Sequence, residues 1–196
     1  MKKVVLLMSH HGSGSDALYA LLDSNPRIQG FQDDSSYDTP LRLVSLTERR
    51  HKLSNASRIY MDHLLHNYQY CLKPDPMVRM VFVVREPEGS VDYMVNMKIL
   101  RRQEAKRYYL YRLRRLCELA RRNRGSVFLT YSNLREGKGM DILADHIGLR
   151  DPLPPLTDFV VPSGKSVLQL HEYERLSESY EKYLYYASKV GSLVVT

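Results

Sequence analysis

The chain is poor in the features that mark secreted, membrane and metal-binding proteins. Among 196 residues it has only two cysteines, Cys71 and Cys117, and their spacing is not that of metal ligands. No apolar stretch approaches the length that a membrane span needs, and there is no internal repeat or low-complexity tract. Hydrophobic residues make up 43% and charged residues 26%, as in ordinary globular proteins. We therefore expect a reduced, cytoplasmic protein without a resident metal.

Apolar runs alternate with amphipathic segments along the chain. The runs that predict strands are residues 3–8, 27–31, 57–61, 77–84 and 126–130. The segments that predict helices are residues 17–22, 64–72, 89–124 (one long helix or a broken one), 140–147 and 176–187. Such alternation is typical of an α/β three-layer sandwich around a mostly parallel sheet, here of about five strands. We expect a single domain over residues 1–196, with the polar stretch 32–56 as a lid, a binding loop or a disordered segment.

The first predicted strand runs directly into a segment rich in glycine and serine, residues 9–16 (SHHGSGSD). Strand, small-residue loop and helix is the layout of a phosphate cradle, because backbone N–H groups there face an anion at a helix N-terminus. A Walker motif needs a lysine after the last glycine, whereas Ser15 and Asp16 follow Gly14. The alternative is an ordinary turn that Ser15 or Asp16 caps.

Arg85 follows four consecutive apolar residues, and the turn-forming run Glu86-Pro87-Glu88-Gly89 comes directly after it. This pattern places Arg85 at the carboxyl edge of a buried parallel strand, where ligands bind in open α/β sheets. Its planar fork of donors suits phosphate, although a salt-bridged arginine at a strand end is an equal alternative. Asp62 and His63 stand at the end of another predicted strand, which makes His63 an acid–base candidate or a structural hydrogen-bonding histidine.

Positive charge is concentrated in the predicted helix between residues 98 and 124, with eleven Lys/Arg against two acidic residues. A solvated face is one explanation, and a nucleic-acid surface with Tyr108, Tyr109 and Tyr111 as stacking platforms is another. In a third explanation, Arg112, Arg114 and Arg115 steer an anionic substrate and the leucines pack inward.

Four stretches resemble, in order, motifs of the sulfotransferases that take sulfate from 3′-phosphoadenosine 5′-phosphosulfate (PAPS). Gly12-Ser13-Gly14-Ser15-Asp16-Ala17-Leu18 resembles the [KR]-S-G-[TS]-[TS]-x-[LV] loop, and residues 62–64 resemble K-T-H-L. Residues 83–87 resemble V-x-R-[DN]-P. Residues 128–134, followed by 142–149, resemble F-L-x-x-Y-E-D-L and its I-x-x-F-L-G-L tail. The gap of 22 residues between His63 and Arg85 is close to that of cytosolic members.

The resemblance implies a P-loop NTPase-like sandwich, PAPS as co-substrate and 3′-phosphoadenosine 5′-phosphate (PAP) as product, with no metal. It implies that residues 12–16 hold the 5′-phosphosulfate and that His63 is the base. It further implies that Arg85 and Ser90 bind the 3′-phosphate, with Lys165 as a second cation, and that Tyr131 lies near adenine.

The chain also departs from the family pattern. Gly12 stands where the family has Lys or Arg, so we expect His10 or His11 to supply the missing positive charge. Asp16 replaces a hydroxyl that would touch phosphate, and it fits an anion site only if it turns outward as a helix cap. Tyr93 replaces a serine, a loss for which Ser90 is the nearest substitute.

Three functions remain open. The favoured one is a sulfotransferase that moves a sulfuryl group from PAPS to a hydroxyl or amine of a small-molecule or glycan acceptor, with His63 as base and Asp62 tuning it. The second is a catalytically degenerate protein of the same fold that binds a nucleotide or an anionic partner. The third is a nucleotide or small-molecule kinase, which the missing Walker lysine and the lack of a magnesium-binding Asp after the central strand disfavour. Nucleic acid is the less favoured partner.

Overall fold

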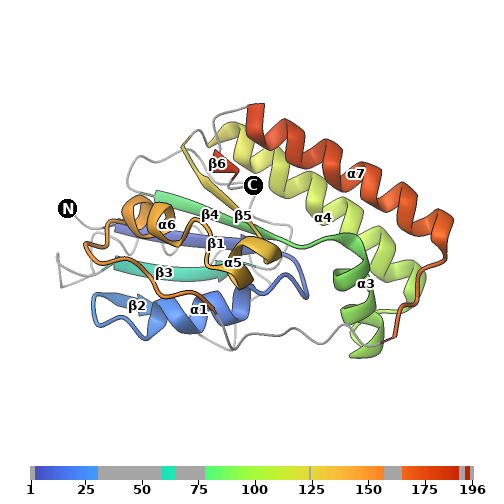
Figure 1. The fold of residues 1–196 in the computed structure, drawn as a ribbon, viewed down its shortest axis with the longest axis horizontal. Coiled ribbons are helices and arrows are strands. Elements are labelled where there is room, and N and C mark those ends of the chain that lie inside the picture. The colour runs from blue at the N-terminus through green and yellow to red at the C-terminus, as the bar shows by residue number, and fades with distance from the viewer. Residues whose placement is uncertain are drawn as a thin grey trace, which may run out of the picture.

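The apolar runs of the sequence form a six-stranded sheet, in the order β2-β3-β1-β4-β5-β6, with every neighbouring pair parallel (Figure 1). The computed structural model describes residues 3–30, 59–64, 78–123, 125–156, 165–189 and 193–194. The strands are β1 (Lys3–Ser9), β2 (Ile28–Gly30), β3 (Ile59–Leu64), β4 (Val78–Val84), β5 (Val127–Thr130) and β6 (Leu193–Val194). The predicted α/β class and parallel sheet are confirmed, and the two-residue β6 is an addition that the sequence did not predict.

Helices cover both faces of the sheet (Figure 1). They are α1 (Ser15–Asp23), α3 (Pro87–Asn96), α4 (Arg102–Arg122), α5 (Tyr131–Glu136), α6 (Met140–Ile147) and α7 (Leu170–Lys189). Side chains alternate along a strand, so Leu6 and Met8 of β1 pack with α3, α4 and α7, whereas Val5 and Leu7 pack with α1 and α6. Each such buried aliphatic side chain stabilises the fold by roughly 1.5–3 kcal/mol. The expected three layers are therefore present.

The third strand is longer than the sequence predicted. We expected it to end at residue 61 and a helix to begin at 64, but β3 continues to Leu64 because Asp62, His63 and Leu64 pair with Leu6, Leu7 and Met8 of β1. His63 is therefore a strand residue near the sheet edge.

The segment predicted as one long or broken helix over 89–124 is broken. α3 ends at Asn96, Lys98 has a left-handed backbone (φ 57°), and α4 begins after Arg101. The Glu104 carboxylate accepts a hydrogen bond from the Arg101 backbone N–H at 3.0 Å, which fixes the new helix start. The short helix α5 was not predicted. It begins at a reciprocal cap in which Thr130 Oγ1 accepts from the Asn133 N–H and Asn133 Oδ1 accepts from the Thr130 N–H.

Several predictions fall outside the described residues. They are the polar stretch 32–56, the helix 64–72 beyond Leu64, Cys71, and the turn that precedes Lys165. Within the ranges that the structure describes, no helix is both long enough and apolar enough to cross a bilayer.

Candidate functional site

The site lies where four parallel strands end on the same edge of the sheet. Ser9 ends β1, His63 is the penultimate residue of β3, Arg85 follows β4 and Tyr131 follows β5. Since β1 lies between β3 and β4, and β5 adjoins β4, these ends are neighbours in space. The sequence-predicted loop, base candidate, arginine and tyrosine are thus brought to one edge.

The loop after β1 has the backbone of an anion cradle. Gly12 and Gly14 have left-handed φ values of 76° and 90°, which side chains rarely adopt, and Gly14 caps α1. Ser13 donates its backbone N–H to the His10 carbonyl at 3.2 Å and closes the turn. Alternating right- and left-handed residues before a helix N-terminus gather N–H groups into a concavity for anions.

A contact with Tyr93 accounts for glycine at the position where the sulfotransferases that the sequence resembles have a cation. A Cβ placed on Gly12 would lie 2.9 Å from the Tyr93 ring, so any side chain there would clash with this α3 residue. The two departures from the family pattern, at Gly12 and Tyr93, therefore occur at one contact. The tyrosine ring fills space beside the loop that a side chain at residue 12 would enter.

Three buried serines connect the loop to His63. Ser13 Oγ donates to Ser15 Oγ (3.2 Å) and Ser15 Oγ donates to Ser9 Oγ (2.8 Å). Ser9 Oγ, which accepts this bond, lies 2.9 Å from His63 Nε2. Ser15 Oγ lies equally close to that nitrogen. Nε2 therefore faces two hydroxyls, each of which can donate to it or accept from it.

The other ring nitrogen of His63 faces Asp16. Nδ1 lies 3.4 Å from Asp16 Oδ1, and the Tyr19 ring stacks at 5.9 Å. Burial lowers the pKa of His63 to about 4, the Asp16 carboxylate acts to raise it, and the charge of Arg112 acts to lower it. The Asp16 side chain is 80% exposed, so water screens its effect. At neutral pH His63 is uncharged and can accept a proton.

Asp62 does not hold the ring as we expected. Its Oδ1 accepts a hydrogen bond from the backbone N–H of His63 at 2.9 Å, so it positions the main chain. The carboxylate that faces the imidazole is Asp16, the residue that looked unfavourable for an anion loop. Sequence reasoning missed this role because it depends on β3 lying beside β1 and under the first turn of α1.

His10 is a buried hydrogen-bonding side chain and not a cation. Its Nδ1 donates to the His11 carbonyl at 3.0 Å, and its Nε2 accepts the backbone N–H of Arg85 at 3.0 Å. Burial lowers its pKa to about 3, so the ring is neutral at any pH of physiological interest. His11 is half-buried with its ring 5.3 Å from that of Tyr108. Of the two expected cations, only His11 stays a candidate.

Arg85 connects the loop to Tyr131. Its Nη1 donates to the Gly12 carbonyl at 3.3 Å, its Nε to Glu86 at 3.0 Å, and its guanidinium lies 4.1 Å from the centre of the Tyr131 ring. A Cβ on Gly89 would lie 2.2 Å from the Arg85 Nε, so this glycine leaves room for the guanidinium against α3. The geometry combines a donor fork with an aromatic ring beside the anion cradle.

Arg112 adjoins the candidate site, although we predicted it in the exposed basic stripe. Its side chain is fully buried, and its Nε donates to the Ser9 carbonyl at 2.7 Å. Burial lowers its pKa to about 10, and it remains a cation at neutral pH. A signal was present: residues 105, 109, 112, 116 and 119 follow helical spacing and are all buried. Arg112 therefore places a positive charge at the base of the loop.

Ser90 and Lys165 have no described hydrogen bond or ion pair with the loop, His63, Arg85 or Tyr131. Ser90 is fully buried on α3, and its hydroxyl has no hydrogen-bond partner among the described residues. Lys165 is exposed, and its carbonyl accepts from Asn96 at the far end of α3 from Arg85. Asp92 fixes the same segment by accepting the Val167 N–H at 2.8 Å. Their predicted contacts with a 3′-phosphate stay predictions.

Comparison with solved structures identifies this architecture. The sulfotransferase domain of the olefin synthase from Synechococcus PCC 7002 superposes with a TM-score of 0.57 at 14% identity, covering 92% of this chain and 94% of that one. A sulfotransferase from Alicyclobacillus acidocaldarius gives a TM-score of 0.56 at 10% identity, covering 97% and 96%. The chain thus shares the fold of these sulfotransferases. No protein-family model matches the sequence, and neither does any curated protein.

Proposed function

We propose that the chain is a PAPS-dependent sulfotransferase that uses His63 as the base for an acceptor hydroxyl or amine. The observation that carries the proposal is the position of a neutral, buried imidazole between loop serines and Asp16, on the same edge as Arg85 and Tyr131. The shared fold supports it. The acceptor is a small molecule or a glycan, whose identity does not follow from this site.

The described residues fit a nucleotide that carries phosphate at two positions. The glycine loop and α1 N-terminus offer N–H groups for one phosphate, and the Arg85 fork suits the other, with Ser90 as a hydroxyl that has no other described partner. Tyr131, already against the Arg85 guanidinium, is the residue to pack beside a base. When bound, PAPS supplies the activated sulfuryl group.

His63 would take the proton of the acceptor at Nε2 as the acceptor oxygen bonds to sulfur and the bond from sulfur to the phosphate oxygen breaks. The Ser9 and Ser15 hydroxyls, both 2.9 Å from Nε2, would then have to turn away for the acceptor to reach this nitrogen. The Asp16 carboxylate would stabilise the resulting imidazolium through Nδ1. Arg112, His11 and the loop N–H groups would offset the negative charge that develops on the leaving phosphate.

The test is transfer of radioactive sulfate from labelled PAPS to a panel of phenols, amines and glycans, with PAP release measured in parallel. Wild type should release PAP only with a suitable acceptor. His63→Ala should lower the rate by about a hundredfold or more, since general-base catalysis contributes typically 10²–10⁴-fold. Equal PAP release by wild type and His63→Ala would show that His63 is not the base.

A second candidate is a nucleotide-binding protein of the same fold without transferase activity. Tyr93 packed against Gly12 favours it, because this contact leaves no room for the cation that the family places in the loop. PAP binding with no transfer to any acceptor, unchanged by His63→Ala, would support this candidate over the first.

A further inference from the structure

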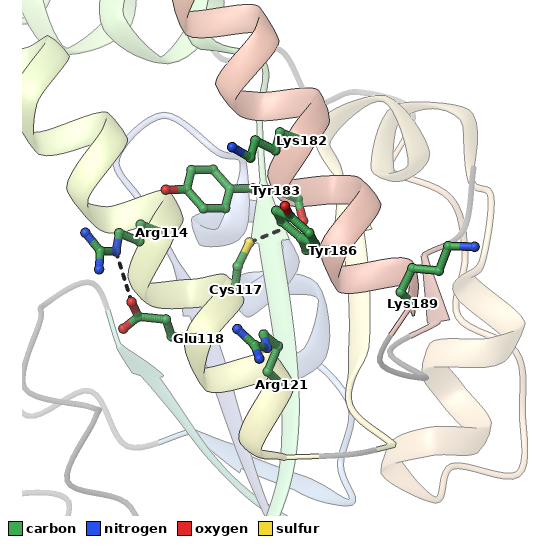
Figure 2. A pocket seen from close by; sticks show the side chains of 8 residues that line it. All are labelled: Arg114, Cys117, Glu118, Arg121, Lys182, Tyr183, Tyr186 and Lys189. Atoms are coloured by element: carbon green, nitrogen blue, oxygen red, sulfur yellow. Dashed lines mark hydrogen bonds and ion pairs between the residues drawn. The ribbon is translucent and has the colours of Figure 1, made fainter.

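The outer surface of α4 and α7 carries a cleft outside the group of residues at the sheet edge. It has a volume of about 620 Å³, within the range of ligand-binding sites (Figure 2). Four cationic residues and two tyrosines lie along it: Arg114, Arg121, Lys182, Lys189, Tyr183 and Tyr186. In Figure 2 these side chains project from the two neighbouring helices around the Cys117 thiol.

Helices α4 and α7 run in the same direction, so cations at corresponding positions of the two helices lie at the same level along the helix axes. Glu172 of α7 pairs with Arg102 and Lys106 of α4, and the Cys117 thiol, about three to four turns further along α4, donates to the Tyr183 carbonyl at 3.6 Å. These contacts join residues 66 to 70 positions apart in sequence.

Three pairs of exposed cations share this offset. Two pairs line the cleft, Arg114 with Lys182 and Arg121 with Lys189, and Arg107 and Arg175 continue the same spacing one step earlier in the sequence. Within each helix, successive cations of these pairs are seven residues apart, so they recur on one face of the helix at intervals of about 10.5 Å. We call these six residues the cation ladder. Such a regular double row suits an extended ligand with repeated negative charges.

Acidic residues only partly neutralise the ladder. Glu118 is held by Arg114 at 3.0 Å and Arg115 at 2.7 Å, and Glu178 is exposed on α7 between Arg175 and Lys182. In the part of the chain that the structure describes, Arg121 and Lys182 make no ion pair, and Lys189 lies 5.2 Å from the centre of the Tyr185 ring. The far end of the cleft therefore keeps an excess of positive charge.

Aromatic rings lie beside the ladder. Tyr186 is 46% exposed at the cleft, and Tyr111 is 45% exposed one turn before Arg114, with the Arg115 guanidinium 5.3 Å from the centre of its ring. Aromatic rings combined with cations suit nucleobases joined by phosphates. An acidic peptide would use the cations and leave the rings unused. Tyr109 does not belong to this surface, because it is buried and its hydroxyl donates a hydrogen bond to the Arg85 carbonyl.

We infer that the cation ladder and the Tyr111 and Tyr186 rings form a binding surface for single-stranded nucleic acid. Phosphates contact the cations, and bases stack on the two rings. The inference goes beyond the proposed sulfotransferase activity and does not depend on it, because none of these residues belongs to the site at the sheet edge.

The test is binding of a short fluorescein-labelled oligothymidylate to the full chain, followed by anisotropy over a series of salt concentrations. Arg121→Gln with Lys189→Gln should reduce the slope of log affinity against log salt by about 1.4, since each lost phosphate contact on a single strand removes about 0.7. Lys138→Gln with Arg150→Gln, which removes the same charge from exposed positions elsewhere, should leave the slope unchanged. An equal reduction of the slope in both double variants would show that the cation ladder is not the binding surface.

Tyr186→Leu separates stacking from general attraction of polyanions. It should weaken oligothymidylate binding about 5- to 150-fold and leave heparin and polyglutamate binding unchanged. Arg85→Ala should not affect the oligonucleotide. If Tyr186→Leu changes nothing, if polyglutamate binds as tightly as the oligonucleotide, or if PAP displaces the oligonucleotide, the inference is wrong. All substituted side chains are exposed apart from Arg85, and circular dichroism verifies the fold of each variant.

Discussion

Acid should destabilise the protein through His10, and the size of the effect follows from its two hydrogen bonds and its burial. In the unfolded chain a histidine binds a proton below a pKa of about 6.5, whereas folded His10 stays neutral until a pKa of about 3. Between these values the unfolded state binds the extra proton, so the free energy of unfolding falls as the pH falls. At about pH 4 the loss from His10 is about 3 kcal/mol, at 1.36 kcal/mol for each pH unit.

His63 adds a similar loss, since its folded pKa is about 4. Together the two losses are a large share of the 5–15 kcal/mol typical of a folded domain. The contribution of His10 and His63 to the free energy of unfolding is therefore fully present above about pH 6.5 and declines toward pH 4.

Urea unfolding at neutral pH and at about pH 4 measures this directly, with tyrosine fluorescence as the signal because the chain has 15 tyrosines and no tryptophan. His10→Gln keeps an acceptor for the Arg85 N–H and loses the bond to the His11 carbonyl, at a cost of about 1 kcal/mol at neutral pH. On acidification it should lose about 3 kcal/mol less than wild type. His171→Gln, exposed on α7, is the matched control and should behave as wild type. If His10→Gln and wild type lose the same free energy of unfolding between neutral pH and about pH 4, the claim that His10 is neutral and buried in the folded protein is wrong.

Three further predictions concern the site. Asp16→Asn removes the carboxylate that raises the pKa of His63, so the ring should titrate at lower pH in a proton NMR titration; an upward shift would contradict the contact. Gly12→Lys should destabilise the protein by about 1–3 kcal/mol through its left-handed backbone and its clash with Tyr93, and adding Tyr93→Ser should recover part of this in thermal unfolding; strictly additive effects would exclude the clash. Tyr131→Leu should keep the fold and lose the preference for adenine over guanine nucleotides in calorimetry; an unchanged preference would leave Tyr131 a core residue.

The parallel sheet was predictable because each strand is a short, continuous apolar run. The carboxyl ends of parallel strands lie at one edge of a sheet, so the positions of the strand ends in the sequence suffice to predict that the glycine loop, His63, Arg85 and Tyr131 lie together. β6 was not predictable, since two residues carry no periodic signal. α5 was missed because its start depends on a side-chain cap between Thr130 and Asn133.

The partners within the site depend on tertiary packing. Asp62 is next to His63 in sequence, yet Asp16 faces the ring, because α1 begins directly above the end of β1. A buried arginine contradicts the usual expectation for charged residues, so we placed Arg112 in the exposed stripe with Arg114 although its helical spacing matches that of the buried face. The contact of Tyr93 with Gly12 links two segments about 80 residues apart, which spacing alone does not reveal.

Calorimetric titration with PAP tests the central claim most directly, because it asks whether the sheet edge is a nucleotide site irrespective of the acceptor. We expect one PAP per chain, weaker binding of ATP, and an affinity reduced about ten- to a hundredfold in Arg85→Ala, from the loss of a charge-assisted contact of about 1.5–3 kcal/mol. Arg85→Lys should show an intermediate loss, since it keeps the charge but not the fork. No PAP binding by the folded wild-type protein, or equal affinity in wild type and Arg85→Ala, would contradict the account.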